Sequence, residues 1–278
     1  MDLSPRPPDI TGYLAESSAA ERQLLRLFDP EAALVICDIG SCEGEDTVRY
    51  ARRFPRARIF AFEPLPGNLA LIRANFDRYG IRQAELVPLA LSDRVGEASL
   101  HVSSGRPPDE FAGRDWNYGN KSSSLLPPES ADPMYGWIEF KETVTVPTET
   151  LDRFCAARGL ARIDFIHMDV QGAEALVLAG ATRMLPHTTA LCLEVTEKAL
   201  YRGQPLRTEI ETLLRDRGFA LGFETRREIE GDQFYVNRRQ PRTWRYLAAR
   251  RTGALISRLR RLAAGLKRGP RDGSAPSL

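Results

Sequence analysis

The chain has 278 residues and an almost even charge balance, with 39 basic and 37 acidic side chains. This length allows one large domain with a well-buried core, or one domain with an appendage. An apolar content of 42% and a charged content of 27% are ordinary for a soluble globular protein. No apolar run reaches the roughly 18 residues that would span a bilayer, and residues 1–5 lack the basic and apolar regions of a secretory signal. We therefore expect a cytoplasmic protein.

The predicted elements alternate between helices and near-continuous apolar strands. The first helix, residues 17–28, has apolar side chains at helical spacing, so residues 1–33 are interpreted as an N-terminal helical segment. Strands and helices then follow in turn, with strands predicted at residues 34–38, 58–63, 84–90, 163–169 and 190–195 and helices at 45–54, 68–79 and 173–184. This alternation predicts an α/β fold whose mostly parallel sheet carries helices on both faces.

The last two predicted strands, residues 219–223 and 233–236, are joined by a segment that is too short for a helical crossover and long enough for a hairpin. The predicted sheet therefore has seven strands and ends in an antiparallel hairpin. By analogy, class I methyltransferases share this arrangement, which favours them over dehydrogenases. The sequence thus indicates a Rossmann-like domain over residues 34–237.

The loop after the first strand is typical of a nucleoside-binding site. Gly40 and Gly44 allow a sharp turn after a buried strand and a close approach of the backbone to a ligand. Glu63 ends the next strand, where an acidic side chain would lie beside a ribose. The residues predicted to bind this ligand are Asp38, Gly40, Ser41, Glu43, Gly44, Glu63, Pro64, Asn68 and Ser92.

The spacing and charge of this loop distinguish between possible ligands. A dinucleotide site requires Gly-x-Gly-x-x-Gly, whereas this chain has Asp-x-Gly-x-x-x-Gly. Glu43 and Glu45 would repel a pyrophosphate and would suit a cationic or zwitterionic ligand. S-adenosylmethionine, which carries a sulfonium, an ammonium and a ribose, is therefore favoured over a nicotinamide cofactor. An ordinary strand followed by an acidic helix N-terminus is the alternative interpretation.

Polar side chains end two further strands, at the edge where an open parallel sheet binds its ligands. His167 and Asp169 are two residues apart and so lie on one face, and Glu194 ends the neighbouring strand. These three are the catalytic candidates. Methyl transfer to an alcohol needs a base: Asp169 is the first choice, His167 has a suitable ordinary pKa, and Asp169 with Glu194 could instead bind a divalent metal. Alternatively, His167 is a core residue and Asp169 caps the following helix.

Residues 103–142 lose the periodic pattern and are interpreted as a long acceptor loop. Their aromatic side chains argue against disorder, because such rings need somewhere to pack. Amides, hydroxyls and aromatic faces together suit a polyhydroxylated acceptor such as a sugar, although a structural flap is the alternative. The residues predicted to bind the acceptor, in this loop and beyond it, are Trp116, Asn117, Asn120, Lys121, Ser123, Gln171 and Tyr201.

Five motifs between residues 34 and 236 can be considered together: Asp38-Ile39-Gly40 with Gly44, Ala61-Phe62-Glu63-Pro64, Thr150-Leu151-Asp152, Met168-Asp169-Val170-Gln171-Gly172-Ala173-Glu174 and Leu193-Glu194-Val195. In combination they resemble the FkbM-type family of S-adenosylmethionine-dependent O-methyltransferases. The resemblance implies a class I methyltransferase fold and methylation of a hydroxyl, frequently on sugars or natural products. The chain departs from the family at Ser41-Cys42, where Ala-Asn is frequent, and at residues 167–172, where the family often has Lys-x-Asp-x-Glu-Gly.

The C-terminal residues 238–278 carry twelve basic side chains and one acidic side chain, so this segment has a charge near +11 and the preceding residues near −9. Within it, residues 250–267 place leucines on one helical stripe and most arginines off that stripe. This basic amphipathic tail could contact an anionic membrane surface, or could pack its leucines on the domain or on a second copy of the chain. We expect no nucleic-acid partner.

The leading hypothesis is an S-adenosylmethionine-dependent O-methyltransferase that acts on a hydroxyl of a sugar, glycolipid, polysaccharide or related natural product. The alternative is a non-catalytic, membrane-associated adaptor that retains the fold and uses its tail and long loop for binding. The predicted location is the cytoplasm, with possible peripheral attachment to the inner membrane surface, and a homo-oligomer is possible.

Overall fold

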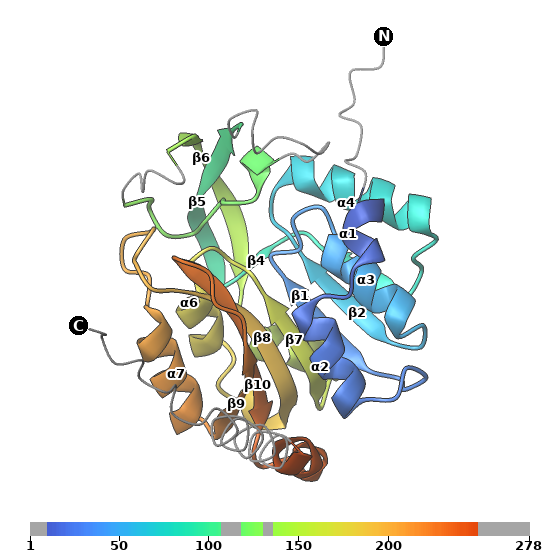
Figure 1. The fold of residues 1–278 in the computed structure, drawn as a ribbon. Helices are drawn as coiled ribbons and strands as arrows, with labels where there is room; N and C mark the ends of the chain where they lie inside the picture. Colours follow the sequence, from blue (N-terminus) through green and yellow to red (C-terminus); the bar gives the residue numbers. More distant parts are fainter. Residues whose placement is uncertain (1–9, 107–117, 130–135, 250–278) are drawn as a thin grey trace, which may run out of the picture.

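The computed structural model describes residues 10–106, 118–129 and 136–249 (Figure 1). Seven strands form one sheet in the order β3-β2-β1-β7-β8-β10-β9. Their bounds are β1 (Val35–Ile39), β2 (Arg58–Phe62), β3 (Ala84–Val87), β7 (Ile163–Met168), β8 (Thr188–Thr196), β9 (Phe219–Glu224) and β10 (Glu230–Asn237). The first five strands in this order, β3, β2, β1, β7 and β8, pair in parallel. Strand β10 pairs antiparallel with both β8 and β9. The predicted mostly parallel sheet with a terminal hairpin is confirmed, and this strand order is that of class I methyltransferases.

Helices cover both faces of this sheet, as the sequence predicts (Figure 1). They are α1 (Thr11–Ala15), α2 (Ala19–Leu27), α3 (Glu45–Arg53), α4 (Pro66–Tyr79), α5 (Leu151–Ala157), α6 (Glu174–Ala179) and α7 (Arg207–Asp216). The first four pack into one apolar core and the last three into another, because successive residues of each strand point to opposite faces. In β1, for example, Ile36 faces the first core and Cys37 the second.

A strand and a helix are clearly shorter in the structure than the sequence predicts. The strand predicted at residues 84–90 divides at Pro88, which has no backbone N–H to donate, into β3 and the short β4 (Ala90–Leu91). The helix predicted at residues 173–184 ends at Ala179, because Gly180 passes close to the backbone of a neighbouring segment: a Cβ at Gly180 would lie 2.0 Å from the Ser92 carbonyl oxygen.

A second sheet includes both ends of the predicted loop at residues 103–142. Its order is β4-β6-β5, and β5 (Gly96–Gly105) pairs antiparallel with β6 (Ile138–Glu149) from Gly96↔Thr148 to Gly105↔Ile138. Both ends of the predicted loop are therefore strand. The sequence hides these strands because their side chains are mostly exposed or half-buried, so they lack the apolar pattern that marks a core strand.

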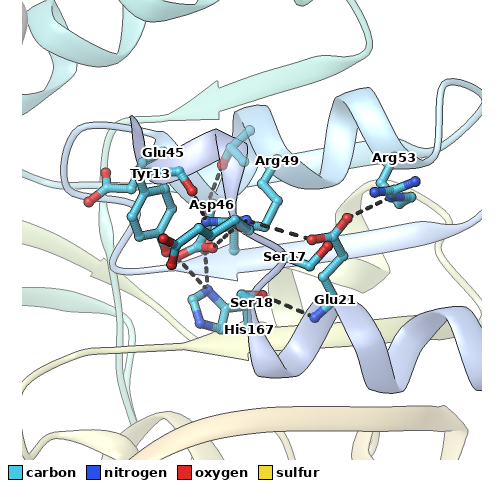
Figure 2. Close-up of polar contacts among 12 residues, drawn as sticks. Tyr13, Ser17, Ser18, Glu21, Glu45, Asp46, Arg49, Arg53 and His167 are labelled. Atoms are coloured by element: carbon cyan, nitrogen blue, oxygen red, sulfur yellow. Dashed lines mark hydrogen bonds and ion pairs between the residues drawn. The ribbon is translucent and has the colours of Figure 1, made fainter. Parts of the chain in front are cut away.

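Arg49 and Arg53 of α3 both contact the N-terminal helical segment (Figure 2). Arg49, almost fully buried, donates to the carbonyl oxygens of Tyr13 and Glu16 and to the Asp46 carboxylate, and it lies 3.6 Å from Glu21. Ser18 caps α2 by accepting from the Glu21 backbone N–H. This network holds the segment before α2 beside the carboxyl ends of the strands, next to the site described below.

The predicted amphipathic tail, residues 250–267, lies outside the described residues. Just before it, residues 241–249 are helical, and the Tyr246 hydroxyl donates to Gln23 of α2 at 2.8 Å. Within the described ranges, no helix is both long and apolar enough to cross a membrane. Membrane contact, oligomerisation and location in the cell therefore stay predictions.

Candidate functional site

The carboxyl ends of β1, β2 and β7 surround an open cavity with an empty volume of about 870 Å³, here called the first cleft. Its walls include six of the residues predicted to bind the cofactor: Asp38, Gly40, Ser41, Glu63, Pro64 and Asn68. They also include six of the residues predicted to take part in catalysis or to bind the acceptor, namely Asn120, Lys121, Ser123, His167, Asp169 and Gln171. Apolar side chains from residues 89–91 line another part of the cleft.

The structure shows a further physical role for the two loop glycines. Gly40 (φ +82°) lies under the end of β7, where a Cβ would come within 1.9 Å of the Asp169 carbonyl oxygen. The Asp169 backbone N–H donates to the Ile39 carbonyl oxygen at 3.0 Å, so the ends of β1 and β7 are in direct contact. Gly44 (φ +78°) packs against Ile72 and Phe76 of α4 and does not line the cleft. These glycines allow the protein's own elements to approach, and that approach shapes the cleft.

Glu63 is oriented by the backbone at the end of β2. Its carboxylate accepts from the Cys42 N–H at 3.1 Å and from the Leu65 N–H at 2.8 Å. Burial raises the pKa of Glu63 from 4.5 to about 7, although these hydrogen bonds act against the increase. Each carboxylate oxygen keeps further acceptor capacity, which suits the two hydroxyls of a ribose.

Residues 118–129 cross the first cleft and are attached to its loop. The Lys121 ammonium lies 2.6 Å from the Glu45 carboxylate and 3.7 Å from that of Glu43. The Asn120 amide donates to Glu43 at 3.1 Å and to Asn68 at 3.0 Å. Glu43, predicted to bind the cofactor, therefore instead anchors this segment, and its fully buried carboxylate does not line the cleft.

After Gly44 and Glu43, Ser92 is the third predicted cofactor residue that does not line the first cleft. The residue is buried. Its hydroxyl donates to Asp93 and its backbone N–H to Glu149, so its contacts connect β4 to the end of β6. The chain breaks at Pro88, after β3, and continues into the second sheet, which carries Ser92 away from the first cleft.

His167 is enclosed by carboxylates. Its Nδ1 lies 4.0 Å from the Asp46 carboxylate (Figure 2). It also lies 3.0 Å from the Asp38 carboxylate, which accepts from the Thr47 hydroxyl. Burial lowers the pKa of His167, but the carboxylates of Asp46, Asp38 and Asp169 outweigh burial and raise it from 6.5 to about 10. At neutral pH the ring is therefore an imidazolium, which has no free lone pair to accept a proton. This geometry argues against His167 as the base and favours a role in orienting Asp38 and stabilising negative charge.

Asp169 and Glu194 are bridged by one amide. Gln171 Nε2 donates to Asp169 at 2.7 Å and to Glu194 at 3.1 Å. Burial raises the pKa of Asp169 from 3.8 to about 6, while Gln171 and the His167 cation act against the increase. Burial and the neighbouring Asp169 raise the pKa of Glu194 well above its usual range. A carboxylate with a pKa near 6 is ionised at neutral pH and is still basic enough to take a proton, so the geometry favours Asp169 as the base.

Gln171 holds this arrangement in an unusual backbone conformation. Its φ is +53°, a region that non-glycine residues rarely adopt. The Ser124 hydroxyl donates to its carbonyl oxygen at 2.7 Å, and the Tyr201 hydroxyl lies 3.1 Å from its side-chain oxygen and 2.7 Å from the Ser122 carbonyl oxygen. Tyr201 thus reaches the site through Gln171 and does not line the first cleft.

Two predictions, the acceptor residues before Tyr118 and a divalent metal, find no counterpart among the described residues. Trp116 and Asn117, predicted to bind the acceptor, lie outside the described residues. Over the parts of the chain that are described, no group of three or more His, Cys, Asp or Glu side chains is arranged to hold a metal ion.

A second open cleft, with an empty volume of about 710 Å³, joins the first at Asp46, His167 and Asp169, which line both. Its walls combine segments that are far apart in the chain: the N-terminal segment, α3, the ends of β7 and β8, and the hairpin between β9 and β10. The acidic residues that line it are Asp46, Asp169, Glu194, Glu230 and Asp232. Of these, only Asp169 and Glu194 were found from the sequence.

Of the residues of the second cleft that the sequence analysis missed, some could have been identified from a local sequence pattern and others could not. Asp46 follows the acidic loop directly, and its place in the first turn of α3 could have indicated it. Asp232 lies opposite Glu194 only because β10 pairs antiparallel with β8 in that register. Tyr13 reaches Asp46 through the fold of the N-terminal segment, with its hydroxyl donating at 2.8 Å. No local pattern could have identified these last two residues.

Comparison with known proteins gives consistent results. A family model described as the methyltransferase FkbM domain matches residues 38–221. The 2-O-methyltransferase NoeI of Sinorhizobium fredii (strain NBRC 101917 / NGR234) is 34% identical over 222 residues, which cover 80% of this chain and 86% of NoeI. The 31-O-demethyl-FK506 methyltransferase FkbM of Streptomyces tacrolimicus is 26% identical over 195 residues, which cover 67% and 73%. The solved N-terminal domain of EvdMO1 with SAH bound is similar over 84% of this chain and 85% of that one, with 16% identity and a TM-score of 0.41.

Proposed function

Because the chain belongs to the FkbM methyltransferase family and is an S-adenosylmethionine-dependent methyltransferase, we propose that it transfers the methyl group to a hydroxyl of a sugar, a glycan or a related natural product. The observation that carries this proposal is the position of Asp169, a carboxylate with a pKa of about 6 at the junction of the two clefts. A base placed there can serve an alcohol, which is a poor nucleophile until its proton is removed.

The first cleft has the side chains that the cofactor requires. Glu63 can accept the hydroxyl donors of a ribose, and apolar residues 89–91 offer a surface for an adenine ring. The carboxylates of Asp38, Glu45 and Asp46 line the same cleft and complement the ammonium and sulfonium charges. Asn120 also has a buried side-chain oxygen without a hydrogen-bond partner among the described residues, which can accept from a bound nucleoside.

When bound, S-adenosylmethionine supplies a methyl group on a positively charged sulfur. The Asp169 carboxylate would take the proton of the acceptor hydroxyl as the acceptor oxygen receives the methyl group, and the cofactor would keep the electrons of the broken carbon–sulfur bond. Gln171 fixes the orientation of that carboxylate, since its amide donates to it at 2.7 Å. The His167 cation, held by Asp38 at 3.0 Å, stabilises the ionised form of Asp169 before the proton arrives.

The acceptor class is supported by the names of two relatives. NoeI is a 2-O-methyltransferase, and FkbM methylates 31-O-demethyl-FK506. Both names describe methylation of oxygen, which supports a hydroxyl as the acceptor group.

The test compares methyl transfer by the native protein and by Asp169→Asn, using glycan and glycolipid extracts from cells that lack the protein as the source of acceptors. Extracts are incubated with the purified chain and isotopically labelled S-adenosylmethionine, and hydrolysed sugars are analysed by mass spectrometry. We expect a sugar that gains the mass of one methylene on an oxygen with the native protein, and no gain with Asp169→Asn. Label found only on nitrogen or carbon, or equal transfer by Asp169→Asn, would contradict the proposal.

A further inference from the structure

The second cleft is a separate chamber that meets the cofactor side only at Asp46, His167 and Asp169. Resting on the proposed function, we propose that this cleft binds the methyl acceptor, and that the acceptor carries a positively charged amine near the hydroxyl that is methylated, as an amino sugar does. The sequence predicts that the acceptor binds to the loop at residues 103–142. Residues 118–129 of that loop lie over the first cleft, so this assignment places the acceptor away from them.

The charge of the second cleft is the first reason. Asp232 and Glu194 are direct cross-strand partners, and Asp169 continues the same row at the end of β7. The group bridging Asp169 and Glu194 is the neutral amide of Gln171, and Asp232 accepts from the Thr225 hydroxyl at 3.2 Å. Carboxylates gathered in this way repel one another, and a bound cation relieves the repulsion.

The two cations that line this cleft are already engaged. His167 is held by Asp38 at 3.0 Å. Arg227 is 75% exposed at its side chain and pairs with Glu230 at 3.3 Å, at the rim formed by the hairpin between β9 and β10. His167 offsets part of the charge of Asp169, but among the described residues neither cation forms an ion pair with Glu194 or Asp232. An anionic acceptor such as a sugar phosphate would be repelled by the same row.

Tyr50 of α3 gives an independent reason. It lines the second cleft and its side chain is fully buried, with its ring edge-on to His167 at 5.6 Å between centroids. Its hydroxyl has no hydrogen-bond partner among the residues that the structure describes. A buried hydroxyl without a partner is costly, and a polar ligand in this cleft supplies the missing partner.

The walls of the cleft also suggest how the acceptor lies. The N-terminal segment covers one side with Tyr13 and residues 18–20, and the Tyr13 hydroxyl is fixed by its hydrogen bond to Asp46. The hydroxyl to be methylated belongs at the junction, beside Asp169. The amine then points along the strand ends toward Glu194 and Asp232. One acceptor molecule thus places its hydroxyl beside the base, Asp169, and its positive charge beside the other two carboxylates.

The test measures binding to the full chain saturated with S-adenosylhomocysteine. The probes are 6-amino-6-deoxyglucose, whose alkylamine is protonated at neutral pH, and its N-acetyl derivative, which has the same ring hydroxyls and no charge. Dissociation constants are obtained by NMR titration. We expect the amine to bind at least about tenfold more tightly, the size of one hydrogen bond to a charged group. Equal affinity of the two sugars, or no binding of the amine, would overturn the inference.

Variants separate this cleft from the rest of the molecule. Asp232→Asn should remove most of the preference for the amine, and Tyr50→Phe should weaken both sugars while leaving the affinity for S-adenosylhomocysteine unchanged. The control is Asp77→Asn, which changes an exposed carboxylate on α4 that pairs with Arg82 and should have no effect. If Asp232→Asn leaves the preference intact, the assignment is wrong.

Failure of this inference and failure of the proposed function give different results. Methylation of neutral glycans without any advantage for the amine overturns the acidic-cleft assignment and leaves the proposed function standing. Preferential binding of the amine that is lost in Asp232→Asn, with no oxygen methylated in any extract, supports the cleft and rejects the proposed function.

Discussion

Substituting Gly40 by alanine tests whether the contact between the ends of β1 and β7 determines activity. The new Cβ would lie 1.9 Å from the Asp169 carbonyl oxygen, whereas ordinary contacts between such atoms exceed about 3 Å. The end of β7 must therefore move by about 1 Å or more, and it carries the Asp169 carboxylate with it. A displacement of that size costs on the order of 10² in rate when it affects reacting groups.

The same substitution also introduces backbone strain at residue 40. The effect of this strain on stability must be separated from the effect of moving the end of β7. Gly40 has φ +82°, and a non-glycine residue in this region costs about 1–2 kcal/mol. Gly80, at the end of α4, has φ +66° and nothing within 4 Å of a Cβ, so Gly80→Ala introduces strain without a clash. For a chain of this size, about 1 kcal/mol lowers Tm by roughly 2–4 °C.

The assay combines thermal unfolding with methyl transfer at a temperature where both variants are folded. Gly80→Ala should lose a few degrees in Tm and keep its kcat. Gly40→Ala should lose more stability and should also lose on the order of 10² in kcat. A Gly40→Ala protein with native kcat would refute the reasoning, because it would show that Asp169 does not depend on the contact with β1.

Three further predictions follow from the site. The affinity for S-adenosylhomocysteine should rise about tenfold between pH 6 and pH 8 by calorimetry, because ribose hydroxyls donate to ionised Glu63, whose pKa is about 7; Glu63→Gln should flatten this profile. Asp169→Asn should lower kcat by about 10² to 10⁴ with little change in cofactor affinity, and the native kcat should fall below pH 6, where Asp169 takes a proton; a rate that rises below pH 6 would contradict the assignment. Lys121→Met should destabilise the chain by on the order of 3 kcal/mol in urea unfolding, because it leaves the buried Glu43 charge unpaired, whereas the exposed Lys141→Met should change stability by less than about 1 kcal/mol.

The position of the cofactor site could be predicted because its signals are local. The order of strands and helices, the glycine loop and the acidic end of β2 all fall within residues 34–64 or repeat along the chain. Residues at the carboxyl ends of parallel strands meet at one edge of a sheet. Asp38, Glu63 and Asp169 accordingly line one cleft.

The charge state of His167 could not be predicted, because it depends on residues that the sequence does not place beside it. Its ordinary pKa suggested a base. The fold brings Asp38 from β1 and Asp46 from α3 to within 4.0 Å of its ring, and their charges raise the pKa despite burial. Coulombic interactions depend on distance in space, so the sum of these effects exists only in the folded chain.

The sequence by itself determined the α/β fold, the family and the strand ends at which the site is built, since periodicity and short motifs act over neighbouring residues. Only the tertiary structure decided that Glu43 holds residues 118–129 over the first cleft, and that Asp232 joins Glu194 in a second one. Those arrangements depend on side-chain packing and strand register between segments far apart in the chain, for which one-dimensional patterns carry no signal.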